Sequence, residues 1–151
     1  MLSRYEQFAF IISDIHRYIQ KLEREEMVRY GLKGAYAQYL AALSRHPDGL
    51  TAAQLCEICD RDKAAVSRIV AEMEEKALVI RERAKDSLYR AKIFLTEEGE
   101  KAASFVFARA QIAVNAVGKG LDDDNRKILY ASLRSIAENL ETISREGIPF
   151  P

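Results

Sequence analysis

The sequence predicts a mainly α-helical protein with a small β-sheet of two or three strands. Apolar residues recur at helical spacing through most of the chain, two short helices follow each other near its middle, and the period becomes that of strands after Leu78. Hydrophobic residues make up 48% and charged residues 30% of the 151 residues, with only seven glycines and three prolines. This balance is typical of one ordered domain.

Long helices with matching apolar seams are predicted at both ends of the chain. Ser3 and Glu6 form a capping-box pattern that opens the first helix, and Asp122 to Asp124 open the last one. Both seams would be exposed on a monomer, so the pattern predicts a homodimer. The seam residues recur at spacings of 4, 3, 4 and 3 and are Phe8, Ile12, Ile15, Ile19 and Leu22 in the first helix and Leu129, Leu133, Ile136, Leu140 and Ile143 in the last.

The middle of the chain contains three shorter predicted helices. One covers residues 35–44 and is ended by Pro47 to Gly49. Thr51 and Gln54 form a second capping-box pattern, which starts a short helix through Ile58. Asp62 caps the next helix, and because the two are separated only by a tight turn, they indicate a helix-turn-helix.

A hairpin and a further helix follow. Val79–Arg83 and Ala91–Leu95 are expected as strands, separated by the polar stretch Ala84–Arg90. Thr96 then caps a helix that runs to Val117, where Gly118 stops it. A helix-turn-helix followed by a hairpin is the winged form, in which the second short helix enters the DNA major groove and the wing lies along the backbone or minor groove.

The charge distribution agrees with this interpretation. The 23 basic and 23 acidic residues cancel over the whole chain, so net charge alone does not indicate nucleic-acid binding. The net charge is −1 over residues 1–60, +3 over 61–92 and −2 over 93–151. The basic segment is thus the one that holds the second short helix and the hairpin.

Two stretches resemble the MarR family of transcriptional regulators. The first is Leu55–Val70 with Met73–Arg81, and the second is Leu95-Thr96-Glu97-Glu98-Gly99 downstream; the resemblance is most specific over about residues 50–100. It implies a bacterial, homodimeric winged helix-turn-helix regulator. The chain would be a single MarR-like domain over 1–151, with dimerisation helices at about 3–26 and 97–146 and a winged helix-turn-helix lobe at about 35–96.

The chain departs from the family pattern at several positions. Ala65 stands where the family usually has Thr, which removes a hydroxyl contact, and Cys59 replaces a Leu-like residue. The Asp-Arg-Arg of the family's wing falls on Ser87-Leu88-Tyr89. Arg90 is the nearest substitute for the wing arginine, and Asp86 the nearest carboxylate.

The predicted DNA-binding residues lie on the two short helices and the wing. Arg68 offers a bidentate fork to guanine or to a phosphate, while Lys63 and Ser67 lie near the start of the recognition helix. The alternative is that these are ordinary solvent-facing charges. The full predicted set is Thr51, Gln54, Lys63, Ala65, Ser67, Arg68, Arg81, Arg83, Lys85 and Arg90.

An effector site is also predicted, with core packing as the favoured alternative. The resemblance implies a cleft between the dimerisation and DNA-binding lobes that takes a small aromatic or amphipathic molecule. His16, Tyr30, Tyr36 and Tyr39 are the candidates for lining it. Amphipathic helices also carry such residues in their cores and interfaces, and packing is the better expectation for them.

The two cysteines are expected to be buried structural thiols. Cys56 and Cys59 form a single CxxC, which lacks the second pair or nearby histidines of a metal site. Both align with apolar core positions of the family's first short helix, and free cysteine is often buried. A redox or metal role is the weaker alternative.

The motifs that the sequence lacks argue against several classes of function. No nucleophile with a base, clustered carboxylates or phosphate-binding glycine loop is apparent, so we expect no enzyme, no cofactor and no metal. The chain has no apolar stretch that fits a membrane span or leader, which predicts a cytoplasmic protein with no membrane partner. The predicted function is sequence-specific binding to a pseudo-palindromic operator in double-stranded DNA by a repressor that an effector releases. A winged-helix scaffold that binds another protein is the alternative.

Overall fold

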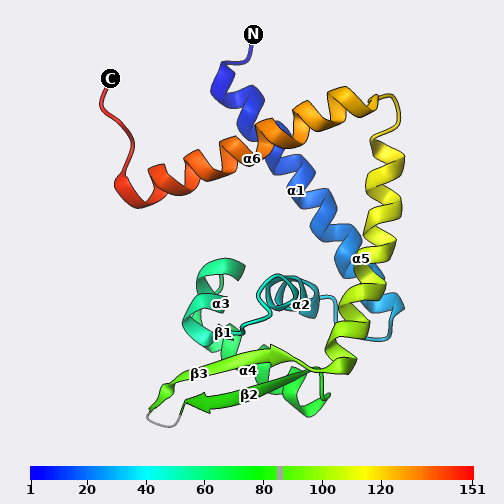
Figure 1. Ribbon diagram of the computed structural model, residues 1–151, viewed down its shortest axis with the longest axis vertical. Helices are drawn as coiled ribbons and strands as arrows, with labels where there is room; N and C mark the ends of the chain where they lie inside the picture. The colour runs from blue at the N-terminus through cyan, green and yellow to red at the C-terminus, as the bar shows by residue number, and fades with distance from the viewer. Residues whose placement is uncertain (85–86) are drawn as a thin grey trace. The chain divides into compact units, whose positions relative to one another are not determined.

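A computed structural model describes the backbone of residues 1–84 and 87–151 and the side chains of residues 1–82 and 91–151. Its elements, in chain order, are α1 (Arg4–Arg29), α2 (Tyr36–Ser44), β1 (Leu50–Thr51), α3 (Ala52–Cys59), α4 (Lys63–Glu75), β2 (Val79–Ala84), β3 (Ser87–Leu95), α5 (Glu97–Val117) and α6 (Asp123–Glu146), as Figure 1 shows. The chain divides into two compact units, Met1–Ala113 and Val114–Pro151.

The sheet of the first unit has three antiparallel strands in the order β1-β3-β2. In its register Leu50 lies opposite Ile93, and Val79 lies opposite Leu95. Strands β2 and β3 form the long hairpin of Figure 1, with an irregularity in the pairing between Glu82 and Ala84. The third strand, β1, leads directly into α3, so no loop separates this edge of the sheet from the helix-turn-helix.

The predicted helix starts are confirmed by their caps. Ser3 and Glu6 form a reciprocal capping box at α1, and Thr51 and Gln54 form one at α3. The side chain of Asp62 accepts the backbone N–H of Ala65 at 2.7 Å at the start of α4. At α6, Asp122 accepts from the N–H of Asn125 in the same way. These four helices therefore begin where short local patterns place them.

The hairpin differs from its prediction. The expected strands were Val79–Arg83 and Ala91–Leu95, with a polar connection over Ala84–Arg90, whereas β2 continues to Ala84 and β3 begins at Ser87. The polar stretch is thus mostly strand, and the wing is longer than predicted. The physical reason is that cross-strand pairing, such as that of Ala84 with Ser87, stabilises a ribbon whose residues lack the alternation of a half-buried strand.

The core lies in the winged lobe and is contributed mainly by α2, α3, α4 and the sheet. Tyr36, Leu40, Leu55 and Met73 have no exposed surface. Met27 at the end of α1 and Ala102 in α5 also belong to this cluster, so both helices are anchored on the lobe by one end. This core holds α3 and α4 in a fixed relation to each other.

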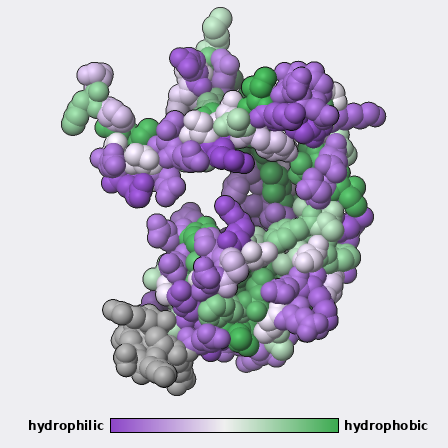
Figure 2. All heavy atoms as spheres, viewed as in Figure 1, coloured by the Kyte–Doolittle hydropathy of each residue, from purple (hydrophilic) through white to green (hydrophobic). Residues whose placement is uncertain are grey.

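The remaining lengths of the terminal helices carry exposed apolar side chains. Met27 is the only buried residue of α1, and no residue of α6 is buried. The predicted seam of α1 is exposed, as at Ile15, where 51% of the residue is accessible, and so is the seam of α6, as at Leu140, also 51%. Figure 2 shows apolar side chains reaching an otherwise mostly hydrophilic surface along α5 as well. Surface of this kind on long helices is typical of helices that pack against a partner.

Candidate nucleic-acid interface

The helix-turn-helix is built from α3 and α4, joined at Asp60 to Asp62. Asp60 adopts a left-handed conformation with φ of 49°, and its N–H caps the end of α3. Asp and Asn tolerate this conformation better than most residues, which accounts for the sharp turn without glycine. Asp62 then caps the start of α4, so the turn consists of the two capping residues, Asp60 and Asp62, with Arg61 between them.

The recognition helix α4 presents one polar face and buries the other. Val66, Ile69, Val70 and Met73 recur at helical spacing and are buried, which confirms the predicted core face. The predicted contact residues Lys63, Ser67 and Arg68 are exposed, and Ala65 is half-buried. The side chains offered to solvent by the first two turns are thus one ammonium, one hydroxyl and one guanidinium.

Charge is distributed unevenly along α4. The first half carries Lys63 and Arg68, whereas the second half carries Glu72, Glu74 and Glu75. Because phosphates repel carboxylates, this polarity favours contact of a polyanion with the first half of the helix. Two of the three carboxylates have basic partners elsewhere in the first unit.

The first of these partners is Lys33, in the connection between α1 and α2. Its Nζ lies 2.8 Å from Oε2 of Glu72, and the hydroxyl of buried Tyr36 donates to the same oxygen at 3.0 Å. The hydrogen bond from Lys33, followed by that from Tyr36, lowers the pKa of Glu72. Burial, with a contribution from Glu72, raises the pKa of Tyr36 to about 12. These contacts fix the second half of α4 against the start of α2.

The second partner is Arg81 in β2, a predicted DNA-binding residue. Its Nε donates to Oε1 of Glu74, so the guanidinium ties the recognition helix to the base of the wing. Arg83, Lys85 and Arg90, the other predicted wing contacts, lie outside the residues whose side chains the structure describes. Lys92 was not predicted; its Nζ donates to the carbonyl of Asp48 at 3.1 Å and joins β3 to the turn before β1.

Thr51 and Gln54 have a structural role at the start of α3. The Thr51 hydroxyl accepts the N–H of Gln54 at 3.2 Å, and the Gln54 side chain accepts the N–H of Thr51 at 2.9 Å. Two backbone donors at the positive end of the helix are thereby satisfied. Both residues remain predictions as DNA contacts.

Two of the predicted effector residues, His16 and Tyr39, line two different cavities of the first unit. The Arg24 cavity, of about 300 Å³, is lined by α1, α2 and α4 and includes Arg24, Tyr39, Arg61 and Arg68. The His16 cavity, of about 500 Å³, includes His16, Ile58 and Cys59. Glu23 and Arg61 line both. Sequence patterns gave no signal for Arg24 or Arg61, which come together only when α1 packs beside the helix-turn-helix.

The aromatic candidates behave mainly as packing residues. Tyr36 and Tyr39 belong to the core, with 0% and 1% of their surface exposed, which confirms the expectation of core packing for these two. The Tyr30 ring packs on Phe105 of α5, with centroids 5.1 Å apart. Arg109 of α5 donates to Glu26 of α1 nearby, at 3.2 Å. Tyr39 still reaches the Arg24 cavity, and His16 the other cavity.

Cys59 is buried and Cys56 is half-buried, and both are free thiols. The expectation of buried thiols is therefore confirmed for Cys59 and met in part for Cys56. Burial raises the pKa of Cys59 to about 11, and its Sγ lies 3.8 Å from the carbonyl oxygen of Gln38.

Among the described residues, no three His, Cys, Asp or Glu side chains gather in a way that would hold a metal ion. None of the helices in that part of the chain has the length and apolar character of a membrane-spanning segment.

The fold and the exposed face of α4 define a winged helix-turn-helix protein. Residues 30–87 match the MarR family model, and this range contains α2, α3, α4 and the first strand of the hairpin, β2. The winged lobe is therefore similar in sequence to the MarR family, and the fold is that of MarR transcriptional regulators. No curated protein sequence matches the chain.

Solved structures of MarR regulators extend this likeness to the terminal helices. The chain is similar to a MarR transcriptional regulator from Methanosarcina mazei, at 25% identity and a TM-score of 0.79, over 91% of this chain and 99% of that one. It is also similar to a putative MarR family regulator from Listeria monocytogenes in complex with a 26mer DNA, at 19% identity and a TM-score of 0.74, over 100% and 99% of the two chains. A MepR mutant from S. aureus bound to an oligodeoxyribonucleotide matches at 19% identity and a TM-score of 0.59, over 88% and 97%.

Proposed function

We propose that the protein is a transcriptional regulator that binds double-stranded DNA sequence-specifically as a homodimer, and that it is not an enzyme. The observation that carries this proposal is the exposed face of α4. Lys63, Ser67 and Arg68 project from a helix whose opposite face is buried and whose end is held by Glu72 and Glu74. The Listeria regulator and MepR, which share this fold, were solved on DNA. Because its ligand is DNA, we expect the protein to act in the cytoplasm.

The exposed seams of α1 and α6 support the proposed dimer. In the arrangement we propose, the chain is a single functional domain, with dimerisation helices at about 3–26 and 97–146 and a DNA-binding lobe at about 35–96. A two-fold dimer places two recognition helices in successive major grooves on one side of the duplex. The operator is then a pseudo-palindrome with half-sites about 10 base pairs apart.

The contact residues have different proposed roles. Arg68 and Ser67 read base edges, and Lys63 contacts phosphate, as do Thr51 and Gln54 beside the positive end of α3. Ala65 supplies only an apolar contact. The DNA phosphate backbone is contacted in the wing by Arg83, Lys85 and Arg90. Arg81 contributes through its pairing with Glu74 or by leaving Glu74 for a phosphate.

Regulation by a small molecule is the finer part of the proposal. The protein acts as a repressor that releases DNA when an aromatic or amphipathic effector binds beside α1, in the Arg24 or the His16 cavity. Arg68 lines the Arg24 cavity and also lies on the DNA-reading helix. Effector and operator must then weaken each other's binding by the same factor.

Selection of bound fragments from random duplex DNA tests the function directly. Enriched pseudo-palindromes are the expected result, and Arg68→Ala should weaken binding to them by about 1–3 kcal/mol if the guanidinium makes a bidentate base contact. Arg134→Ala removes the same charge at an exposed site on α6, which belongs to the second unit of the chain, and is the matched control. Binding of all fragments without enrichment would contradict sequence-specific recognition, and binding of none would favour a protein-binding scaffold.

A further inference from the structure

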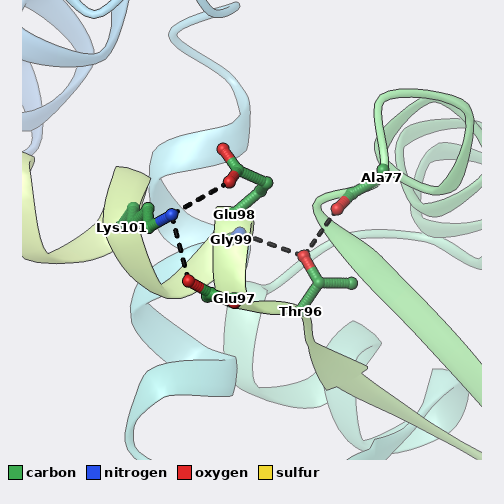
Figure 3. Close-up of polar contacts among 6 residues, drawn as sticks. All are labelled: Ala77, Thr96, Glu97, Glu98, Gly99 and Lys101. Atoms are coloured by element: carbon green, nitrogen blue, oxygen red, sulfur yellow. Dashed lines mark hydrogen bonds and ion pairs between the residues drawn. The ribbon is translucent and has the colours of Figure 1, made fainter.

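One hydroxyl connects the end of the recognition helix to the start of α5. Thr96 lies between β3 and α5, and its Oγ1 donates to the carbonyl oxygen of Ala77 at 2.5 Å and accepts the N–H of Gly99 at 3.1 Å, as Figure 3 shows. A hydroxyl has one proton to donate, and this one is used. Ala77 immediately follows the cap of α4, and Gly99 is in the first turn of α5.

Backbone contacts reinforce this connection. The N–H of Thr96 donates to the carbonyl oxygen of Leu78 at 3.0 Å. Gly99 is buried against the same carbonyl, and a Cβ at this position would lie 2.1 Å from the Leu78 oxygen. The oxygen belongs to the backbone, so it has little freedom to move aside. We call these four residues, Ala77, Leu78, Thr96 and Gly99, the α4–α5 joint.

The α4 side of the joint is itself a fixed structure. The N–H of Ala77 donates to Glu74 and that of Leu78 to Met73, which is the Schellman pattern of a helix end. Ala77 has φ of 56°, in the left-handed region that favours glycine. This conformation turns the chain back toward β2, and the Ala77 carbonyl meets the hydroxyl of Thr96.

The α5 side is fixed as well. Lys101 pairs with Glu97 at 3.1 Å and with Glu98 at 3.2 Å, across the first turn of α5 (Figure 3). Carboxylates at the start of a helix are favoured by its dipole, and pairs at these spacings stabilise a helical turn. The joint therefore connects a closed helix end to a stabilised first turn.

From this geometry we propose that Thr96 is a positioning residue for DNA recognition, which couples the direction of α5 to that of the recognition helix. This inference rests on the proposed function, because it assigns DNA reading to α4. The hydroxyl does not touch DNA in this proposal; its loss lets α4 tilt relative to α5. Specific binding, which needs both recognition helices in register, then weakens more than binding to unrelated DNA, which needs only charge.

The test compares variants of the full dimeric protein at Thr96. Thr96→Val keeps the shape of the side chain and removes the hydroxyl, whereas Thr96→Ser keeps the hydroxyl. We expect Thr96→Val to lower affinity for a selected operator about 3- to 10-fold, the loss typical of one hydrogen bond, with affinity for a scrambled duplex unchanged. Thr96→Ser should restore the operator affinity. Thr142→Val, on α6, removes a hydroxyl that donates to Glu138 and is the matched control.

Hydrogen exchange separates failure of the joint from failure of the proposed function. In free Thr96→Val, the amides of Gly99 and of Leu78 should exchange faster together, whether or not the protein reads DNA. If the wild-type protein selects no DNA sequence, the proposed function fails while this measurement still tests the joint. Unchanged exchange at Leu78, or a parallel loss of operator and scrambled binding, would overturn the proposal.

A second variant covers the case in which Thr96→Val does not fold. Gly99→Ala leaves the hydroxyl in place and separates α5 from Leu78 through the added Cβ. It should give the same preferential loss of operator binding and the same faster exchange at Leu78. A folded Gly99→Ala protein with wild-type discrimination between operator and scrambled DNA would contradict the coupling.

Discussion

Introducing a carboxylate into the apolar seam of α6 should dissociate the homodimer. Ile136 is 37% exposed in the single chain, so a partner would cover the surface that the chain itself leaves open. Full burial of an isoleucine side chain contributes about 1.5–3 kcal/mol, and the exposed fraction corresponds to roughly 0.6–1.1 kcal/mol in each subunit. Ile136→Asp removes this contribution twice per dimer.

The carboxylate adds a further cost, because a polar group placed in an apolar contact without a partner costs about 1–3 kcal/mol in proteins. Together these effects amount to about 3 kcal/mol or more, which raises the dissociation constant by roughly a hundredfold or more. Sedimentation velocity over a range of micromolar concentrations measures the change directly.

Ala131→Asp provides the matched control for this substitution. Ala131 is exposed on the same helix but lies five positions earlier, about 140° around it, away from the seam. It should leave the dimer intact. If Ile136→Asp dissociates no more readily than Ala131→Asp, or if the wild-type protein sediments as a monomer, the seam of α6 is not a subunit contact and the proposed two-fold reading of DNA fails with it.

Three further predictions concern stability and reactivity. Ala77→Gly should raise the melting temperature by relieving the left-handed alanine, with a net gain of about 0.5–1 kcal/mol after the entropy cost of glycine, whereas Ala71→Gly within α4 should lower it. Cys59, whose pKa is about 11, should react with iodoacetamide far more slowly than Cys56, as mass spectrometry of the native protein would show. Because folding raises this pKa from 9.0, the stability that the protonated thiol contributes is complete below pH 9 and is lost as the pH rises toward 11. Folding lowers the pKa of Glu72 below 4.5, so the stability that Glu72 contributes is present above that pH and is lost as the pH falls through the folded value. Lys33→Met removes the largest cause of this shift, so the free energy of unfolding should fall less steeply with decreasing pH in this range. An unchanged pH dependence of the free energy of unfolding would contradict the pairing.

Features specified by neighbouring residues were predictable from the sequence. The caps at Ser3, Thr51, Asp62 and Asp122 depend on side chains that reach only three residues along the chain, and all four lie where the patterns indicated. The buried stripe of α4 and the exposed seams of α1 and α6 follow from helical period in the same way. The fold class was therefore accessible without tertiary information.

Features that depend on distant residues were not predictable. Glu72 contacts Tyr36, which is 36 positions earlier, and no local pattern links the two. The start of β3 at Ser87 depends on pairing with β2 and not on the apolar content of residues 87–90. At the candidate site, the pattern identified the exposed face of α4, but the pairing of Arg81 with Glu74 and the gathering of Arg24, Arg61 and Arg68 around one cavity arise only on folding.

The charges of α4 also oppose its own helix dipole. The first turn contains Lys63 and no acidic residue, and the last turn contains Glu74 and Glu75 and no basic one. Isolated helices are stabilised by the reverse arrangement. The Asp62 carboxylate supplies one negative charge at the N-terminal end, but Lys63 beside it and the carboxylates of the last turn oppose the dipole, and a bound phosphate would offset the charge of Lys63. Lys63→Glu should accordingly stabilise the free protein against heat while weakening DNA binding, a trade between folding and affinity located at a single residue.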